Sequence, residues 1–352
     1  MSKIKEKVCS FEELYKAMNL CKKDVMWKTS VAGWVKNGLV NCHKLNKQLL
    51  DGSYKIDKYS KFVITEPKRR DIVSTRMKDR VFQRSLCDNY LYHQLTKGLI
   101  YDNPACQIDK GTDFTRRRLS THLQKYYRKH GKNGYVLQCD ISGFFGSTRH
   151  SVAKSVVNER VDDAWVRSHV FKIIDSYGTK ENPDMGMGLG SQVTQLVQLA
   201  VLDDLDHYIK EVLEIKHYVR YMDDFILIHH DKEHLNYSKK QIEKELLKIH
   251  LSLNQKKSQL FPIKNGIPFL GFTFYLTASG KIIKKILNSN VNNERRKLRK
   301  LKLLVDEGIL SKEDVNKCYA AWKAHAKSGN TYTLIRNMDK FYKSLWEGDK
   351  NG

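Results

Sequence analysis

Two largely apolar runs rich in β-branched residues, 216–220 and 225–230, flank the polar tetrapeptide 221–224. This pattern predicts two strands joined by a tight turn, because short apolar runs bounded by turn residues are typical of hairpins. A third apolar run, 134–139, predicts another strand, which ends at Asp140. The intervening chain is long enough to return that strand beside the hairpin. We therefore expect a sheet in which acidic residues lie at neighbouring strand ends.

A glycine-rich segment, 185–195, precedes the apolar run 196–202 and predicts a loop that leads into a helix. Glycines allow close approach of the backbone to a nucleotide, and a helix N-terminus favours an anion. The helix is expected to continue into a second acidic cluster at 203–206. Its carboxylates would fan around a cylinder rather than converge, so we interpret this cluster as the solvated end of the helix.

The C-terminal part of the chain has helical periodicity. Leu298, Leu301 and Val305 fall on one stripe of a predicted basic helix. Ser311, followed by acidic residues, predicts the N-cap of a second helix, and a third is expected from about 331 to 346. The motifs discussed below interleave from about residue 67 to residue 272, so we expect one domain at 1–280 and a helical domain at 281–352.

The charge balance favours a nucleic-acid partner. The 352 residues include 63 Lys and Arg against 39 Asp and Glu, a net charge of +24, which attracts phosphate backbones in a salt-dependent manner. Stretches 116–118 and 125–132 mix cations with aromatic rings, which suits an RNA-tracking or stacking surface. A membrane surface would fit the charge equally well, but no apolar segment has the length of a signal peptide or a membrane span. We expect a cytoplasmic protein without membrane association.

The cysteine and histidine residues give weaker signals. The seven cysteines are scattered without the paired spacing of a zinc or redox site, so we expect reduced and mostly buried thiols. His229, His230 and His234 could suggest a metal site, but we interpret them as surface or template-side residues, because short motifs often match by chance.

Asp223 and Asp224 would lie together at the tip of the predicted hairpin. A polar turn alone could explain them. With Asp140 at an adjacent strand end, however, the three carboxylates supply the hard oxygen ligands that Mg²⁺ prefers. Such a set can hold two ions about 3.5–4 Å apart for phosphoryl transfer.

The tetrapeptide Tyr-Met-Asp-Asp, with Arg220 before it and Phe225 after it, resembles the active-site hairpin of reverse transcriptases, and 134–145 resembles the family's first catalytic motif. The resemblance implies an α+β right-hand polymerase fold, with fingers, a palm whose antiparallel sheet is backed by helices, and a helical thumb. It also implies an RNA-directed DNA polymerase. Two Mg²⁺ ions, with Mn²⁺ as a substitute, would be bound by Asp140, the Ile141 carbonyl, Asp223 and Asp224.

The resemblance also assigns nucleotide contacts. Phe145 matches the aromatic ring that excludes a ribose hydroxyl, although one of Phe144 and Phe145 is expected in the core, because adjacent strand residues face opposite sides. Gly190 and Gln195 match the loop that positions the template and the nucleotide.

Three cations match positions that meet phosphates in the family. Arg70, and secondly Lys68, match the fingers cation that meets the triphosphate, where Arg offers a rigid fork and Lys a point charge. Lys257 is preferred over Lys256 as the acid that protonates pyrophosphate. An exposed, solvated Lys is an equally good interpretation, because such residues are common in this chain.

The biological context stays open between two alternatives. A polymerase that acts with a dedicated non-coding RNA in antiviral defence fits the short chain, in which no stretch is assigned to an RNase H, endonuclease or maturase domain. Gly188-Leu189, where retroviral enzymes carry Pro-Gln, resembles the enzymes of diversity-generating retroelements, which work with an accessory protein. We expect an RNA template, a DNA product and dNTPs as partners, and leave a homo-oligomer or accessory protein open. An RNA-binding scaffold with vestigial catalysis is a weaker alternative.

Overall fold

The computed structural model describes residues 2–65 and 69–347. The chain forms two compact units, which we call unit 1 and unit 2. Unit 1 contains Met1–Gly111, Gln138–Ile226 and Asn236–Gln259, and unit 2 contains Thr112–Leu137, Leu227–Leu235 and Leu260–Gly352. These units do not follow the division at residue 280 that we expect from the motifs, and the assignment of 1–280 and 281–352 to separate domains stays a prediction.

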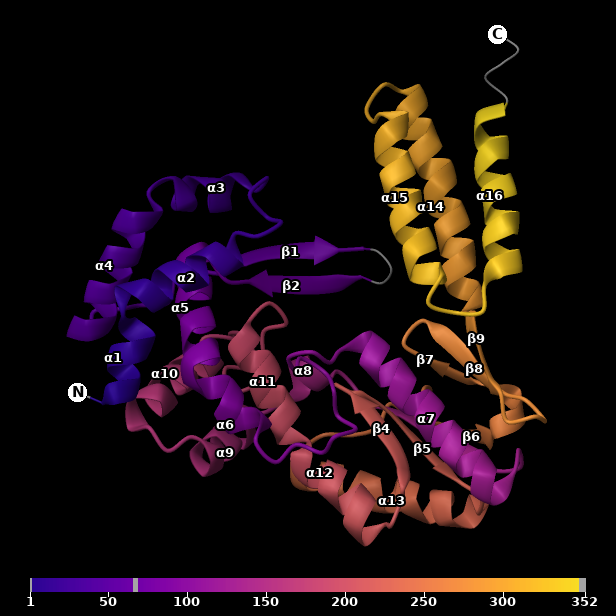
Figure 1. Cartoon of the computed structure of the whole chain (residues 1–352). Coiled ribbons are helices and arrows are strands. Elements are labelled where there is room, and N and C mark those ends of the chain that lie inside the picture. The colour runs from indigo at the N-terminus through magenta and orange to yellow at the C-terminus, as the bar shows by residue number, and fades with distance from the viewer. Residues whose placement is uncertain (1, 66–68, 348–352) are drawn as a thin grey trace. The chain divides into compact units, whose positions relative to one another are not determined.

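Helices dominate unit 1 (Figure 1). Its elements are α1 (Lys3–Cys9), α2 (Phe11–Cys21), α3 (Thr29–Lys36), α4 (Gly38–Asp51), β1 (Ser60–Ile64), β2 (Arg70–Ser74), α5 (Met77–Leu86), the π-helical turn η1 (Cys87–Leu91), α6 (Tyr92–Thr96), α8 (Phe144–Ser147), α9 (His150–Arg160), α10 (Ala164–Asp175), α11 (Gln192–Val201), α12 (Asp203–His207), the π-helical turn η2 (Tyr208–Val212) and β4 (His217–Tyr221). β1 and β2 form an antiparallel pair in which Ile64 lies opposite Arg70.

Unit 2 combines one long helix, a small sheet and three C-terminal helices. Its elements are α7 (Thr112–His130), the 3₁₀ turn η3 (Ile263–Asn265), β7 (Ile267–Phe269), β8 (Phe272–Leu276), β9 (Ile282–Ile286), α14 (Asn288–Asp306), α15 (Lys312–Ala326) and α16 (Tyr332–Glu347). β7, β8 and β9 are antiparallel neighbours in that order. Three strands and one helix have residues in both units: β3 (Tyr135–Asp140), β5 (Asp224–His229), β6 (Gln259–Pro262) and α13 (Lys232–Lys248).

The central sheet has the strand order β4-β5-β3-β6. The predicted hairpin is confirmed, with β4 ending at Tyr221 and β5 beginning at Asp224. Met222 occupies the turn with a positive φ of 57°, a conformation that non-glycine residues adopt mainly where surrounding contacts impose it. The predicted strand ending at Asp140 is also confirmed, and β3 lies next to β5. The expected α+β class with antiparallel sheets is therefore correct.

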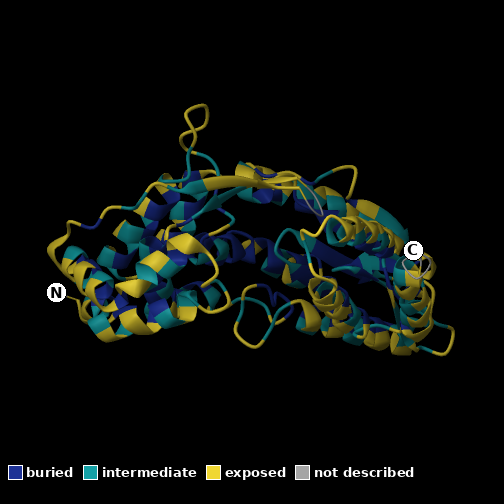
Figure 2. Ribbon diagram, turned by 90° about the horizontal axis from the view of Figure 1, so that it is seen from above, coloured by how far each residue is buried: buried dark blue, intermediate teal, exposed yellow. Residues whose placement is uncertain are grey.

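The core follows from local sequence patterns. Ser191 caps α11, accepting a hydrogen bond from the Thr194 backbone N–H at 3.3 Å, and this helix is buried along most of its length. The predicted N-cap at Ser311 is confirmed at the start of α15, where Ser311 also forms a reciprocal capping box with Asp314. Most surface helices alternate buried and exposed residues (Figure 2).

Within the described residues, no helix is both long and apolar enough to pass through a bilayer.

Candidate active site

Asp140 ends β3 and is held from its backbone by the loop that follows α13. The Asn254 N–H donates a hydrogen bond to the Asp140 carbonyl oxygen at 2.8 Å, and the Asp140 N–H donates to Ser258 Oγ at 3.3 Å. The same loop places Lys257 Nζ 2.7 Å from Asp140 Oδ2. The carboxylate belongs to a residue that is only 7% exposed, whereas the Lys257 side chain is 54% exposed. The structure therefore places Lys257, the lysine favoured from the sequence, next to the carboxylate of Asp140.

The hairpin turn is joined directly to the end of β3. The Ile141 N–H donates a hydrogen bond to the Asp223 carbonyl oxygen at 3.2 Å, and Asp140 is near enough to Asp224 for its charge to raise the pKa of Asp224. Residues that are far apart in sequence are thus brought together in unit 1: Asp140, Ile141, Asp223, Asp224 and Lys257.

The electrostatics of this cluster show an excess of buried negative charge. Burial raises the pKa of Asp224 to about 7, with further contributions from the charges of Asp223 and Asp140. Burial also raises the pKa of Asp223, and the charge of Asp140 adds to it. The hydrogen bond to Asp140 raises the pKa of Lys257, which keeps this ammonium protonated. The site therefore lacks enough positive charge to balance its three carboxylates.

The oxygen donors of this cluster fit a hard divalent cation, because such ions prefer carboxylate oxygens. A bound cation would also relieve the repulsion between the carboxylates of Asp140, Asp223 and Asp224. In the stretches 2–65 and 69–347, no group of three or more His, Cys, Asp or Glu side chains is arranged to hold a metal ion by itself. Mg²⁺ usually takes only one or two carboxylates and completes its shell with water and substrate phosphates. An open cluster of this kind is compatible with that mode of binding.

A buried ion pair lies behind the turn. The guanidinium of Arg220, on β4, meets the carboxylate of Asp206, on α12, through Nε at 2.7 Å and Nη2 at 2.6 Å, and neither residue is exposed. Arg220 Nη1 also donates to the carbonyl oxygen of Met222 at 3.0 Å. The remaining lone pairs of Asp206 accept from Tyr218 Oη and Asn103 Nδ2. Arg220 therefore connects the strained turn to the protein interior.

The interpretation of 203–206 as a solvated helix end is wrong for two of its three acids. Asp206 is fully buried, and Asp203 is 4% exposed and pairs with Arg160 at 2.8 Å; only Asp204 is exposed. α12 packs into the protein because its Asp206 has a cationic partner on β4. The sequence signal for this burial is Arg220, a charged residue that follows Tyr218 and Val219 in a predicted strand and that needs a counterion if it is buried.

The fingers cations are placed only in part. Arg70 begins β2, and its charge lowers the pKa of Asp223 against the effect of burial. It is therefore within electrostatic range of the acidic cluster. Lys68 lies outside the described residues.

Gly190 and Gln195 shape the loop before α11. A Cβ at Gly190 would lie 2.8 Å from the carbonyl oxygen of Val73 on β2, so only glycine fits this approach. Gln195 Nε2 donates a hydrogen bond to the Leu189 carbonyl oxygen at 3.1 Å. Both residues line a cavity of about 310 Å³, together with Arg80 and Arg84. The close approach we expected toward a nucleotide is made toward the β2 strand in this structure.

Phe145 lies on a helical turn rather than on a strand. Phe144 and Phe145 belong to α8, with ring centroids 5.7 Å apart in an edge-on arrangement. Phe144 is buried and Phe145 is half-buried. One of the two is therefore in the core, as expected, but the strand alternation used to predict it is wrong, because Gly143 adopts a left-handed conformation and starts a helix there.

A sheet that brings three acidic residues together at a β-hairpin is the arrangement of a nucleic-acid polymerase of the right-hand class. The sequence profile of the reverse transcriptase (RNA-dependent DNA polymerase) family matches residues 64–274. Because this match covers more than half of the chain, the chain belongs to the reverse transcriptase family.

Comparison with solved structures agrees with this fold. Telomerase from Candida albicans, in complex with a fragment of telomeric RNA, gives a TM-score of 0.52 at 13% identity, covering 82% of this chain and 54% of that chain. Apo telomerase from Candida tropicalis gives a TM-score of 0.50 at 14% identity, covering 65% of this chain and 49% of that chain. This chain thus spans about half the length of these relatives. Among curated proteins, no sequence matches it.

Proposed function

We propose that this protein is an RNA-directed DNA polymerase that extends a primer with dNTPs. The observation that carries the proposal is the meeting of Asp140, Asp223 and Asp224 at adjoining strand ends, with Lys257 in a salt bridge to Asp140. The reaction forms a bond between the primer 3′-oxygen and the α-phosphorus of the nucleotide, and it breaks the bond to pyrophosphate.

The three carboxylates and the Ile141 carbonyl would hold Mg²⁺, or Mn²⁺ as a substitute. When bound, two such ions lower the pKa of the attacking hydroxyl and neutralise charge that develops on the phosphates. Around them, Arg70 would bind the triphosphate. The half-buried ring of Phe145 would exclude a 2′-hydroxyl, and Lys257 Nζ would donate a proton to the departing pyrophosphate.

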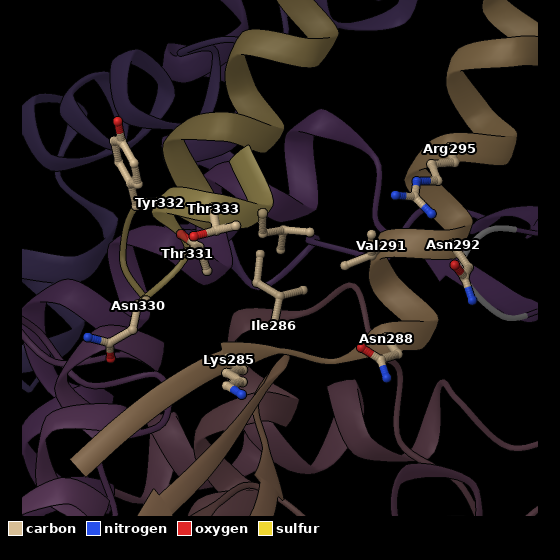
Figure 3. Close-up of a pocket in the computed structure, with 12 residues that line it drawn as sticks. Lys285, Ile286, Asn288, Val291, Asn292, Arg295, Asn330, Thr331, Tyr332 and Thr333 are labelled. Atoms are coloured by element: carbon tan, nitrogen blue, oxygen red, sulfur yellow. The ribbon is translucent and has the colours of Figure 1, made fainter. Parts of the chain in front are cut away.

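We assign the helices α14, α15 and α16 to a thumb that holds the product duplex. A cavity of about 890 Å³ lies within unit 2 at the beginnings of α14 and α16 (Figure 3). Among the described residues, its lining includes Lys285 and Arg295 and no acidic residue. Amide side chains from Asn288 and Asn292 also line it. These groups are donors suited to phosphate oxygens, which supports the assignment.

Replacing Lys257 with Ala should lower kcat for primer extension by about 10²-fold, because general acids contribute on that scale. The neighbouring exposed Lys256 provides the matched control, since Lys256→Ala removes the same charge from the same loop. Single-turnover extension measured over a range of pH would compare the two variants. Equal kcat values in both would contradict a proton-donating role for Lys257.

Replacing Phe145 with Ala should increase incorporation of ribonucleotides relative to deoxynucleotides at least about tenfold, because a steric gate works by excluding one hydroxyl group. The measurement is the ratio of kcat/KM for rGTP and dGTP on one RNA template. Phe144→Ala offers a comparison in which a core ring is lost instead. A ratio that does not change in Phe145→Ala would show that the ring only packs.

The direct test is primer extension by the purified full chain on an RNA template with dNTPs and Mg²⁺.

We propose a role in antiviral defence with a dedicated non-coding RNA. Leu189 supports a second candidate, a diversity-generating retroelement enzyme that works with an accessory protein. Genes beside this one decide between them, since a variable-protein gene with an imperfect repeat favours the retroelement. Failure of extension on several templates and primers, with RNA binding intact, would favour the scaffold alternative.

A further inference from the structure

The helical turn α8 carries Phe145 but is too short to hold its own position. It contains only the four residues Phe144–Ser147, and a single turn is unstable by itself, because it orders several residues for very few hydrogen bonds. It begins after Gly143, whose φ of 56° lies in the left-handed region, and it ends at Thr148, whose backbone is extended. Contacts from other elements must therefore determine where the ring of Phe145 lies.

A buried hydrogen-bond network fixes the end of this turn. The Thr148 hydroxyl donates to the Phe144 carbonyl oxygen at 2.7 Å. A hydroxyl has one proton to donate, so the same oxygen accepts from Nε2 of Gln198, on α11, at 2.9 Å. Gln198 is fully buried and Thr148 is 1% exposed. These bonds are shielded from water, and breaking one of them would leave a buried polar group without its partner.

The amide of Gln198 stands in apolar surroundings on its own helix. Its neighbours Val197 and Leu199 are both fully buried, and an amide in such a place costs free energy unless its hydrogen bonds are made. Within the described part of the chain, the Gln198 side chain bonds to the Thr148 hydroxyl and the Phe144 carbonyl oxygen. The amide is therefore placed to hold α8 rather than to complete α11.

We propose that Gln198 is a positioning residue that sets the discrimination between deoxyribonucleotides and ribonucleotides by holding the turn that presents Phe145. The inference rests on the proposed function, in which the ring of Phe145 excludes a 2′-hydroxyl. Steric exclusion works only while the ring stays in place, and a displacement of about 1 Å can change a rate about 10²-fold. Gln198 acts on this ring through Thr148 and the backbone of α8.

The glycine-rich loop makes a second connection to the same turn. The Met187 N–H donates to the Phe145 carbonyl oxygen at 2.6 Å, and the Gly186 N–H donates to the Thr148 carbonyl oxygen at 2.9 Å. These backbone bonds do not depend on the side chain at position 198. Loss of the Gln198 amide should therefore loosen the ring without unfolding the turn.

The test measures kcat/KM for dGTP and for rGTP, with the full chain, one RNA template, a pre-annealed primer and Mg²⁺. Gln198→Met and Thr148→Val keep the approximate shape of the side chains but remove the amide donor and the hydroxyl. Each should lower the preference for dGTP about fivefold, mainly through a higher kcat/KM for rGTP. Thr148→Ser retains the hydroxyl and should retain the preference.

Thr96→Val is the matched control. The Thr96 hydroxyl makes the same kind of bond, to the carbonyl oxygen of Tyr92 four residues earlier, at 2.7 Å. It lies at the end of α6, to which no nucleotide contact is assigned. This variant should therefore leave the preference for dGTP unchanged.

Two combined variants separate positioning from packing. Gln198→Met/Thr148→Val leaves neither polar group without its partner, so its Tm should be nearer the wild-type value than that of Thr148→Val, while its preference for dGTP stays reduced. In a Phe145→Ala background, Gln198→Met should not change the preference further, because the ring on which Gln198 acts is already absent.

The outcomes distinguish this inference from the polymerase proposal. If the wild type extends the primer and Phe145→Ala loses the preference, an unchanged preference in both Gln198→Met and Thr148→Val would overturn the positioning role alone. A preference that recovers together with the Tm in the double variant would also overturn it, because the pair would then serve packing. A wild type that extends the primer with neither nucleotide would refute the polymerase proposal, and this inference with it.

Discussion

Asp223→Asn and Asp224→Asn should each abolish primer extension, with a loss of about three orders of magnitude or more, because several kcal/mol of transition-state stabilisation depend on charge at this position. Asn retains the shape of Asp but supplies a weaker, uncharged ligand. The variants should bind RNA as the wild type does, since the phosphate backbone is bound by cations elsewhere. Extension rates and RNA affinity, measured on the same preparations, check both halves.

Thermal unfolding adds a readout that separates chemistry from folding. Burial and like charges raise the pKa of Asp224 to about 7, so its ionised form costs stability at pH 8 in a chelator, and Asp224→Asn should raise the unfolding free energy by about 1 kcal/mol. Mg²⁺ should raise the Tm of the wild type and have little effect on the variant. Asp204→Asn, an exposed acid, is the matched control. Primer extension by Asp224→Asn at the wild-type rate would contradict the proposed mechanism.

The sequence predicts the hairpin, the strand of Asp140 and their adjacency, because each depends on local patterns: two apolar runs, a polar turn, and a carboxylate that closes a strand. The family resemblance favours Lys257 over Lys256, and the structure places the Lys257 ammonium beside the Asp140 carboxylate. The roles of these residues in the reaction stay predictions.

Long-range pairing is what the local patterns miss. Asp206 looks like a surface residue until Arg220, on a different element, is placed beside it. The sequence alone suggests that Gly190 leaves room for a nucleotide, but in the structure the backbone of β2 lies against it. Likewise, the histidine rings of 229–234 gain a partner only when the end of α7 stacks His130 on His230. Periodicity and propensity carry no information about such partners.

Arg220→Met should destabilise the protein by about 3–5 kcal/mol, because it leaves Asp206 buried without a counterion. Asp206→Leu should cost a similar amount for the converse reason. The double variant should be more stable than the sum of the two losses predicts, although Tyr218 and Asn103 then lack their acceptor. Denaturant unfolding of all four proteins measures the coupling energy directly.

The same cycle tests whether this pair positions the catalytic turn. Arg220 Nη1 holds the carbonyl oxygen of Met222, whose φ is positive, and without this donor the turn can relax and move both following carboxylates. The double variant, once shown to be folded, should therefore lose kcat about 10²-fold with a smaller change in KM. Arg160→Met, which breaks the partly exposed pair with Asp203, should reduce stability less and leave kcat near wild type. Full kcat in the folded double variant would show that the ion pair serves packing alone.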